Sequence, residues 1–179
     1  MLLFQDIFTG KDILTDSYKM KLVDDFVYVV EGSYVTKSGD NFSDEMFGGN
    51  PSAEEQVEEL EQASSKSGFD VILNHEDLEE YNEQPTLKQF LKTLKKIIGF
   101  AKEKIPKDRF DSIFKPKMTE FFTTGPGKER FSNFQIYFSK GYITEDGDVK
   151  AAPVLIDADD TGMKSTIYYF KDLMDEVKM

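Results

Sequence analysis

The chain has 179 residues, of which 39% are hydrophobic, and carries a formal net charge of −12. A chain of this length buries a substantial core, so we expect residues 1–179 to form a single domain. The sequence contains no cysteine and one histidine, which excludes disulfides, thiol nucleophiles and most metal or general-base sites. We therefore expect a non-enzymatic protein of a reducing compartment, the cytoplasm, without an obligatory cofactor. No apolar run is long enough to span a bilayer, so no membrane insertion is expected.

The N-terminal part of the chain predicts β-structure. Residues 2–8 and 26–30 are rich in aromatic and β-branched side chains, which is typical of strands. Residues 9–20, between them, are rich in turn formers. The dipeptide Gly32-Ser33 predicts a turn into a further strand at residues 34–37, so we expect a hairpin there.

The next segment is acidic and irregular. Residues 38–68 lose the apolar periodicity and accumulate Ser, Gly and acidic side chains. Such a composition does not offset the entropy of ordering the chain, so we expect a long, mobile acidic loop. Phe69–Leu73 predict the next strand. His75 has no nucleophile or metal-ligand motif beside it, so we expect it to form hydrogen bonds at the end of that strand instead of acting in catalysis.

Two amphipathic helices are predicted in the middle of the chain. Thr86-Leu87-Lys88-Gln89 matches the capping box, and apolar residues then recur at helical spacing. A second helix is expected over residues 110–122, disturbed at Pro116 and closed by Gly125-Pro126-Gly127. The polar face of the first helix carries Lys88, Lys92, Lys95, Lys96 and Lys102.

These helices form a hairpin over residues 86–124, in a basic part of an acidic chain. Residues 86–130 hold twelve Lys and Arg against five Asp and Glu, while the rest of the chain holds ten against twenty-nine. Such segregation concerns partners more than the fold. The lysines form either a solubilising surface or a docking face for an acidic partner such as a tubulin tail, an anionic membrane or a nucleic acid. The acidity of the remaining chain argues against nucleic acid, because it repels phosphates.

The C-terminal part predicts strands again, at residues 134–138, 149–156 and 165–170, with turns at Asp146-Gly147 and Asp160-Thr161-Gly162. Strands on both sides of an inserted helical pair indicate an α+β fold. The Asp-Thr-Gly tripeptide also occurs in aspartic proteases. Those enzymes need two such aspartates sharing a proton, whereas this chain has one copy.

Acidic clusters near the C-terminus are candidate metal ligands. Asp157, Asp159 and Asp160 begin like a calcium-binding loop, but position twelve is Tyr168 instead of glutamate. We therefore expect either weak calcium binding, with a Kd on the order of 10⁻⁴ to 10⁻³ M, or a solvated acidic surface. Gly125-Pro126-Gly127-Lys128 lacks the spacing and the Ser/Thr of a phosphate-binding loop, and indicates a helix end.

Several segments resemble one protein family, in order and in spacing. The stretch Phe47-Gly48-Gly49-Asn50-Pro51-Ser52-Ala53-Glu54-Glu55 is similar to a signature of the translationally controlled tumour protein family, close to Gly-Gly-Asn-x-Ser-Ala-Glu. Further segments that resemble the family are Met1–Phe8, Asp16–Lys19, Val30–Gly32, Asp70–His75 and Phe131–Phe134. The resemblance covers effectively the whole chain. Ser139-Lys140 replace the Gly-Glu of the second family signature, so we expect a divergent member or paralogue.

This resemblance implies a β-tent, in which two small, mainly antiparallel sheets lean together beside a helical hairpin and a long flexible acidic loop. It also implies a cytoplasmic interaction protein, linked to growth and survival, that binds calcium and microtubules, with tubulin binding placed in the basic hairpin. An exchange-factor or stabilising role toward a small GTPase is implied as an alternative, with Asp12 at the matching acidic position. We expect a monomer that binds calcium weakly and binds tubulin through the lysines.

Overall fold

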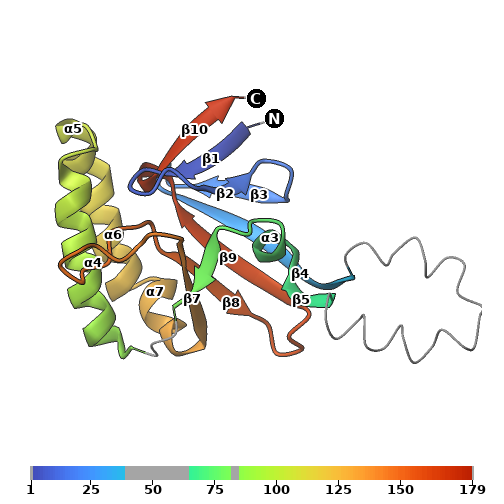
Figure 1. The fold of residues 1–179 in the computed structure, drawn as a ribbon. Helices are drawn as coiled ribbons and strands as arrows, with labels where there is room; N and C mark the ends of the chain where they lie inside the picture. Colours follow the sequence, from blue (N-terminus) through green and yellow to red (C-terminus); the bar gives the residue numbers. More distant parts are fainter. Residues whose placement is uncertain (1, 39–64, 82–84, 179) are drawn as a thin grey trace, which may run out of the picture.

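A computed structural model describes residues 2–38, 65–81 and 85–178. The architecture is α+β: a helical hairpin lies against one side of two antiparallel sheets (Figure 1). The expected fold class is therefore confirmed. Most of the predicted loop at residues 38–68 lies outside the described residues, and its last residues belong to a strand, β5 (Ser65–Phe69).

The smaller sheet joins the two ends of the chain. Its strands follow the order β10-β1-β2, and both pairings are antiparallel. These strands are β1 (Leu2–Asp6), β2 (Asp12–Thr15) and β10 (Met174–Lys178). Leu2 pairs with Lys178, so the first and last described residues lie side by side (Figure 1).

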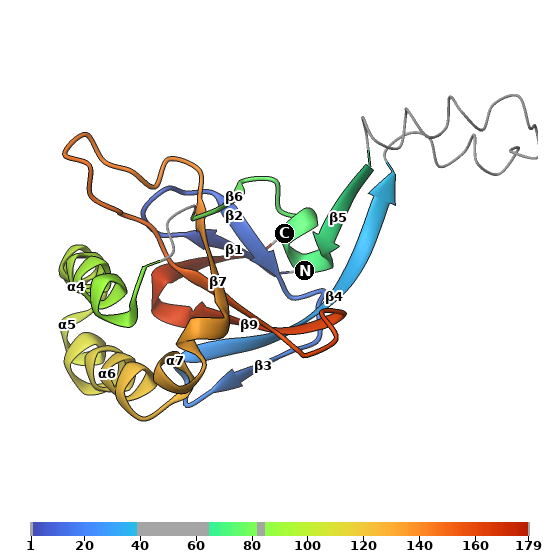
Figure 2. The same ribbon diagram turned by 90° about the horizontal axis from the view of Figure 1, so that it is seen from below.

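The larger sheet follows the order β3-β4-β9-β8-β7-β6, and β5 pairs with the far half of β4. All of these pairings are antiparallel. The strands are β3 (Met20–Val23), β4 (Val27–Ser38), β6 (Leu78–Glu80), β7 (Phe134–Ser139), β8 (Val154–Ala158) and β9 (Lys164–Phe170). β4 and β5 extend beyond the other strands as a two-stranded arm, on the side away from the helices (Figure 2).

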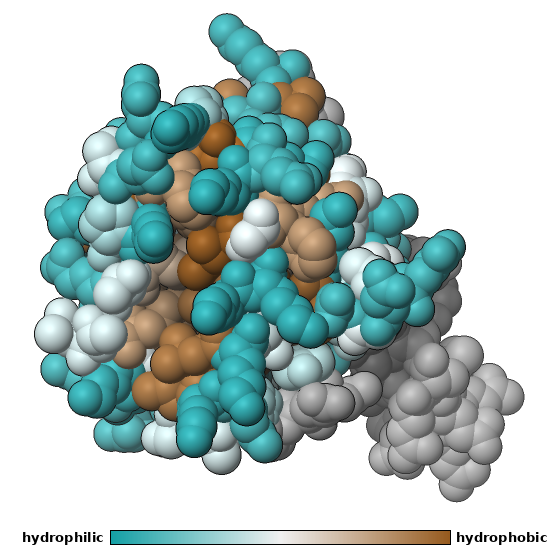
Figure 3. Space-filling model, turned by 90° about the vertical axis from the view of Figure 1, so that its left-hand side faces the viewer, coloured by the Kyte–Doolittle hydropathy of each residue, from teal (hydrophilic) through white to brown (hydrophobic). Residues whose placement is uncertain are grey.

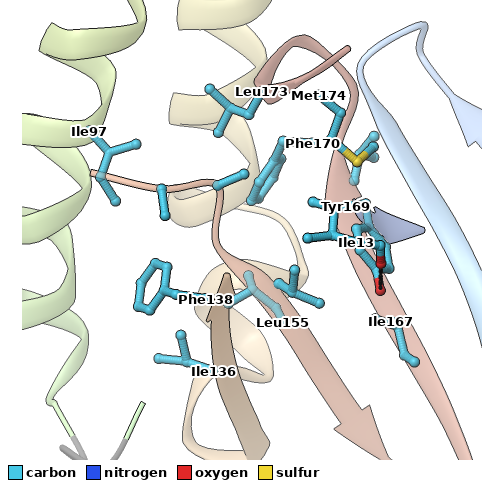
Figure 4. Close-up of a cluster of buried hydrophobic side chains, with 14 of the residues drawn as sticks. Ile13, Ile97, Ile136, Phe138, Leu155, Ile167, Tyr169, Phe170, Leu173 and Met174 are labelled. Atoms are coloured by element: carbon cyan, nitrogen blue, oxygen red, sulfur yellow. Dashed lines mark hydrogen bonds between the residues drawn. The ribbon is translucent and has the colours of Figure 1, made fainter. Parts of the chain in front are cut away.

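Alternating side chains along β4 and β9 divide the core into two layers. Tyr28 and Tyr169 face the smaller sheet: the Tyr28 ring lies 5.2 Å from that of Phe4, and the Tyr169 hydroxyl donates to the Ile13 carbonyl at 3.1 Å. Phe170, one position further along β9, turns toward the helices (Figure 4). One apolar layer therefore joins the two sheets, and the other joins the larger sheet to the hairpin.

The first helix of the hairpin begins where the capping box predicts. α4 spans Leu87–Lys102. Gln89 N donates to Thr86 Oγ1 at 3.2 Å, and Thr86 N donates to Gln89 Oε1 at 2.9 Å, so two orphan donors of the first turn are satisfied. The buried stripe consists of Phe90, Leu94, Ile97 and Ala101. Because these residues recur at helical spacing, the lysines fall on the opposite side.

The second helix of the hairpin is irregular, as Pro116 predicts. It consists of α5 (Lys107–Arg109), a π-helical turn (Phe110–Phe114) and α6 (Lys115–Thr123). Proline has no N–H, and its ring clashes with the carbonyl four residues earlier; the wider π turn before Pro116 relieves that clash. The segment Gly125-Pro126-Gly127 closes the second helix, as predicted: α6 ends at Thr123, and a separate short helix, α7 (Pro126–Glu129), and a 3₁₀ turn (Phe131–Asn133) follow.

The predicted turn at Gly32 is wrong. β4 continues through this residue, and Gly32 pairs with Ser165 of β9. A Cβ on Gly32 would lie 2.5 Å from Ser165 Oγ, so glycine serves here to let a side chain of the neighbouring strand approach. Sequence alone does not distinguish such a glycine from one in a turn.

Other local predictions also need correction. Residues 70–73 form a helical turn, α3 (Asp70–Leu73), instead of a strand, and Asp70 Oδ1 accepts hydrogen bonds from Val71 N and Ser33 N there. The turn-rich residues 9–20 contain β2 and the start of β3. The strand predicted at 149–156 begins only at Val154. β6 and β10 were not predicted, because short strands gain their stability from partners that are distant in sequence.

Candidate partner-binding face

The lysine face, defined as Lys88, Lys92, Lys95, Lys96 and Lys102, is an exposed side of α4. Lys88, Lys92 and Lys96 succeed one another at four-residue intervals, so their side chains leave the same side of the helix, about 5–6 Å apart. Lys95 and Lys102 form a second row beside them. The structure thus places all five predicted residues on one helix, each in contact with solvent.

Among the described residues, one member of the lysine face forms an ion pair. Lys96 Nζ lies 2.7 Å from Asp148 Oδ1, and the two side chains remain 63% and 29% exposed. Such an exposed pair contributes at most about 1 kcal/mol, because both charges stay hydrated. The other four ammonium groups have no carboxylate within ion-pair distance in the described part of the chain.

Two basic residues of the second helix, Arg109 and Lys117, are placed differently, because they fasten the hairpin to the sheets. Arg109 donates to both carboxylate oxygens of Asp172, and its Nη1 donates to Asp25 Oδ2 at 2.9 Å. The hydrogen bonds to Asp172 raise the pKa of Arg109. Lys117 Nζ lies 3.6 Å from Asp24 Oδ2. The predicted surplus of positive charge is therefore partly neutralised on the second helix, where Arg109 and Lys117 are paired, while four of the five lysines of the lysine face have no ion pair in the described part of the chain.

A tight turn presents the acids that hold the second helix. Asp24 and Asp25 connect β3 to β4, each with a φ of 54°, and Phe26 N donates to the Val23 carbonyl at 3.0 Å. Two consecutive residues in the left-handed region are typical of a type I′ hairpin turn, in which Asp is tolerated. Hydrogen bonds from Lys171 and Arg109 lower the pKa of Asp25.

The helical side of the molecule also exposes apolar surface. Figure 3 views this side and shows a band of hydrophobic surface with hydrophilic side chains on both of its flanks. Leu91 is 38% exposed and lies on α4 between the buried stripe and the lysine face. The hairpin therefore offers a partner both positive charge and apolar contact area.

Asp12, the candidate GTPase contact, lies elsewhere. It is the exposed first residue of β2, at an edge of the smaller sheet. Gln5 Nε2 donates to Asp12 Oδ1 at 2.9 Å and so orients the carboxylate. Asp12 belongs to the smaller sheet and the lysine face to the hairpin, so the structure keeps these two predicted sites separate.

The candidate calcium ligands are engaged in other contacts. Asp157 accepts from Arg130 Nε and Nη2, both at 2.9 Å, and from Asn133 Nδ2. Burial raises the pKa of Asp157, but these hydrogen bonds lower it, and the net shift is downward. The Asp157 carboxylate is therefore already paired with a cation of the protein, the Arg130 guanidinium.

The turn predicted from the Asp-Thr-Gly tripeptide is confirmed. Gly162 N donates to the Asp159 carbonyl at 3.0 Å, and Gly162 has a φ of 74°. Thr161 Oγ1 donates to Asp159 Oδ1 at 2.7 Å, and Asp160 is exposed beside it. No cluster of three or more His, Asp or Glu suited to a metal ion occurs among the described residues, so calcium binding stays a prediction.

His75 lies in the turn after α3, and not at the end of a strand. It is buried, and its ring lies 6.2 Å from that of Tyr18. The expected position of His75 at a strand end is therefore wrong, because residues 70–73 form α3.

Sequence analysis missed the buried carboxylate of Asp6, which is 1% exposed. Asp6 accepts hydrogen bonds from Phe8 N, Ala152 N and Ser139 Oγ, each at 2.8 Å. Burial raises the pKa of Asp6, and these hydrogen bonds only partly oppose the shift. Two of the donors come from residues more than a hundred positions away, so no local pattern reveals them.

The comparisons with known proteins agree on one family. The family model of the translationally controlled tumour protein matches residues 1–175. The homologue of Drosophila melanogaster is 39% identical over 140 residues, which are 76% of this chain and 77% of that protein. The homologue of Caenorhabditis briggsae is 35% identical over 145 residues, or 78% of each chain.

Solved structures agree in fold. An NMR structure of the translationally controlled tumour protein from Caenorhabditis elegans matches with a TM-score of 0.64 and 29% identity, over 100% of this chain and 99% of that one. A related structure from Schizosaccharomyces pombe matches with a TM-score of 0.60 and 23% identity over both whole chains, which concerns the fold alone. Within the described residues, no helix has the length and apolar character needed to cross a membrane. The chain belongs to the translationally controlled tumour protein family.

Proposed function

We propose that this chain is a non-enzymatic, cytoplasmic interaction protein that docks on acidic partners, tubulin foremost, through the lysine face of α4. The observation that carries the proposal is the contrast between the lysine face and the two paired cations of the second helix. Arg109 and Lys117 are paired with carboxylates of the sheet edge, whereas Lys88, Lys92 and Lys95 are exposed and have no such partner within the described residues.

The spacing of the lysines suits a chain of carboxylates. The Cβ atoms of neighbouring lysines on one side of the helix are about 5–6 Å apart, which is shorter than the Debye length of about 8 Å at physiological salt. Their fields therefore overlap, and an acidic segment meets several ammonium groups at once. Each exposed pair contributes about 0.2–1 kcal/mol, so binding depends on several pairs together and weakens with salt.

Microtubule co-sedimentation at low and at physiological salt tests the proposal. The triple charge reversal Lys88→Glu, Lys92→Glu, Lys95→Glu should weaken binding about tenfold or more at low salt, because it removes three pairs worth about 0.5 kcal/mol each. Lys96 is left unchanged so that its contact with Asp148 persists.

The matched control changes charge equally at three other lysines of the hairpin. Lys104, Lys107 and Lys115 are exposed, so their triple reversal alters the net charge by the same amount without touching the lysine face. This control should retain most of the affinity. Equal loss in both triple variants would mean that net charge, and not the lysine face, governs binding, and unchanged binding in the first variant would reject the docking face.

A second candidate function is regulation of a small GTPase by Asp12. The supporting observation is that Gln5 orients this exposed carboxylate at a sheet edge. An acid brought within about 4 Å of a bound magnesium–nucleotide changes the energy of that nucleotide complex by roughly 1–4 kcal/mol in wet to surface-like surroundings.

Nucleotide release from the GTPase should therefore be slower with the Asp12→Ala variant than with the wild type. The control is Asp175→Ala. Asp175 is exposed on β10, and its backbone pairs with Gln5 of β1, as that of Asp12 does from the other side. Equal release rates for wild type and Asp12→Ala would end this candidate.

We also propose that exposed carboxylates on the acidic surface bind calcium weakly. Asp159 and Asp160 are exposed side by side at the turn between β8 and β9. Unshaped groups of carboxylates bind calcium with a Kd on the order of 10⁻⁴ to 10⁻³ M.

A further inference from the structure

A hollow of about 540 Å³ lies beside the lysine face, between α4 and the loop that runs from Tyr142 to Val149. Its α4 side is lined by Lys92 and Lys96, and its loop side by Tyr142, Ile143 and Asp148. The lysine face therefore does not stand alone: two of its ammonium groups form the rim of a concave surface.

The loop side of the hollow is held by backbone hydrogen bonds. Ile143 and Val149 form a β-bridge, and Lys150 N donates to the Tyr142 carbonyl at 2.7 Å. Thr144 N donates to the Asp148 carbonyl at 2.8 Å. These bonds fix the loop before a partner arrives, so little ordering entropy opposes binding there.

The wall of the hollow is aromatic. The Tyr142 ring is stacked on that of Phe138 at 5.2 Å with an interplanar angle of 22°, and the Tyr81 ring meets Phe138 edge-on at 5.3 Å. Ile143 is 51% exposed at the rim, an unusual exposure for a large apolar side chain in a hollow. An apolar group that covered Ile143 and the adjoining rings would gain about 25 cal/mol for each Å² removed from water.

A carboxylate is already accommodated at the mouth of this hollow. Asp148 Oδ1 lies 2.7 Å from Lys96 Nζ, and both side chains reach solvent. Because the pair is exposed, a carboxylate of a partner exchanges with Asp148 at little cost. Lys92, one turn earlier on α4, offers a second ammonium group to the next carboxylate of the same partner.

We propose that the hollow accepts an aromatic side chain of an acidic peptide segment, while carboxylates that flank this side chain bind Lys88, Lys92 and Lys96. The inference rests on the proposed docking function and adds to it a rule of selectivity: an acidic segment with an aromatic residue binds in preference to one without. The charge is complementary to the lysines, and the apolar wall is complementary to the ring.

Fluorescence anisotropy with two labelled synthetic peptides tests this inference on the full-length protein. Both are short and glutamate-rich; one has a central tyrosine and the other a central alanine. The tyrosine peptide should bind about five- to tenfold more tightly to the wild type, as expected when roughly 40–55 Å² of the aromatic ring is buried. Both affinities should fall with salt, while their ratio stays constant, because apolar burial is not screened.

Ile143→Ala removes the exposed side chain at the rim. Because Ile143 is 51% exposed, its truncation should leave the protein folded, so a loss of peptide selectivity reports on the hollow itself. The ratio of the two affinities should fall to about twofold in this variant. Leu22→Ala is the matched control, because Leu22 is 40% exposed on β3 and does not line the hollow. This variant should keep the wild-type ratio. Chemical-shift changes at Thr93, Tyr142 and Ile143 on adding the tyrosine peptide supply an independent reading of the location.

The outcomes separate the inference from the function on which it rests. Equal affinity of the two peptides for the wild type overturns the aromatic site and leaves docking on the lysine face intact. An unchanged ratio in Ile143→Ala, or shift changes confined to other surfaces, overturns the location. Binding of neither peptide overturns the proposed docking function itself.

Discussion

Replacing Arg109 with alanine should destabilise the protein more than any other single change in the hairpin's ionic contacts. The guanidinium donates to both oxygens of Asp172 and also to Asp25, and so ties the start of the second helix to two separate segments of the sheets. Its side chain is 23% exposed and that of Asp172 is 7% exposed. Arg109→Ala would therefore leave the buried Asp172 carboxylate without its cation.

The magnitude follows from this burial. Removing one partner of a buried ion pair costs about 3–5 kcal/mol, because the remaining charge is left without compensation. Since Arg109 retains some access to water, we expect about 2–4 kcal/mol for Arg109→Ala. This is a large part of the roughly 5–15 kcal/mol by which a domain is ordinarily stable.

Urea unfolding followed by circular dichroism measures the loss as a lower midpoint at an unchanged slope. Lys117→Ala is the matched control, because Lys117 also joins the hairpin to the β3–β4 turn, yet its partner Asp24 is 58% exposed. The control should cost at most about 1 kcal/mol. The double variant Arg109→Ala, Asp172→Asn should recover part of the loss, because it removes the stranded charge.

Two results would contradict this reasoning. One is a loss for Arg109→Ala that is no larger than the loss for Lys117→Ala. The other is a double variant as unstable as the sum of its two single changes, which would mean that the two side chains do not interact.

Three further measurements test other parts of the structure. Burial raises the pKa of Asp6 above its ordinary value, so its contribution to stability is largest below the unfolded pKa and declines as the pH rises through the folded pKa. The stability of the wild type relative to Asp6→Asn should therefore increase as the pH falls from neutral toward about 4, and a pH-independent difference would refute this. Gly32→Ala should cost about 1–3 kcal/mol because its Cβ would lie 2.5 Å from Ser165 Oγ, and adding Ser165→Ala should restore part of the loss; no recovery would place the strain elsewhere. Calcium titration followed by residue-resolved NMR should shift Asp159 and Asp160 with a Kd on the order of 10⁻⁴ to 10⁻³ M, whereas saturation at micromolar calcium would require a shaped site.

Local signals in the sequence predicted the elements that depend on neighbouring residues. The capping box at Thr86 and the apolar stripe that follows it correctly predicted α4, because helix initiation and amphipathicity are properties of a few consecutive turns. The disturbance at Pro116 and the turn at Gly162 were predicted for the same reason: a missing N–H and a positive φ act locally.

The failures concern residues whose environment comes from distant parts of the chain. Gly32 reads as a turn, but its role is set by Ser165 on the neighbouring strand. The short strands β2, β3, β6 and β10 have weak patterns of their own and are stabilised by pairing. The buried carboxylate of Asp6 depends on donors that only the folded chain brings to it.

The same division applies to the candidate site. The sequence alone determined that five lysines share one side of an amphipathic helix, since helical periodicity fixes their directions. Tertiary structure decided which of the hairpin's cations are neutralised, because the carboxylates of Asp24, Asp25 and Asp172 reach the second helix only after the sheets have formed. It also placed the Tyr142–Val149 loop beside α4, and so made a hollow out of segments that are some fifty residues apart in the chain.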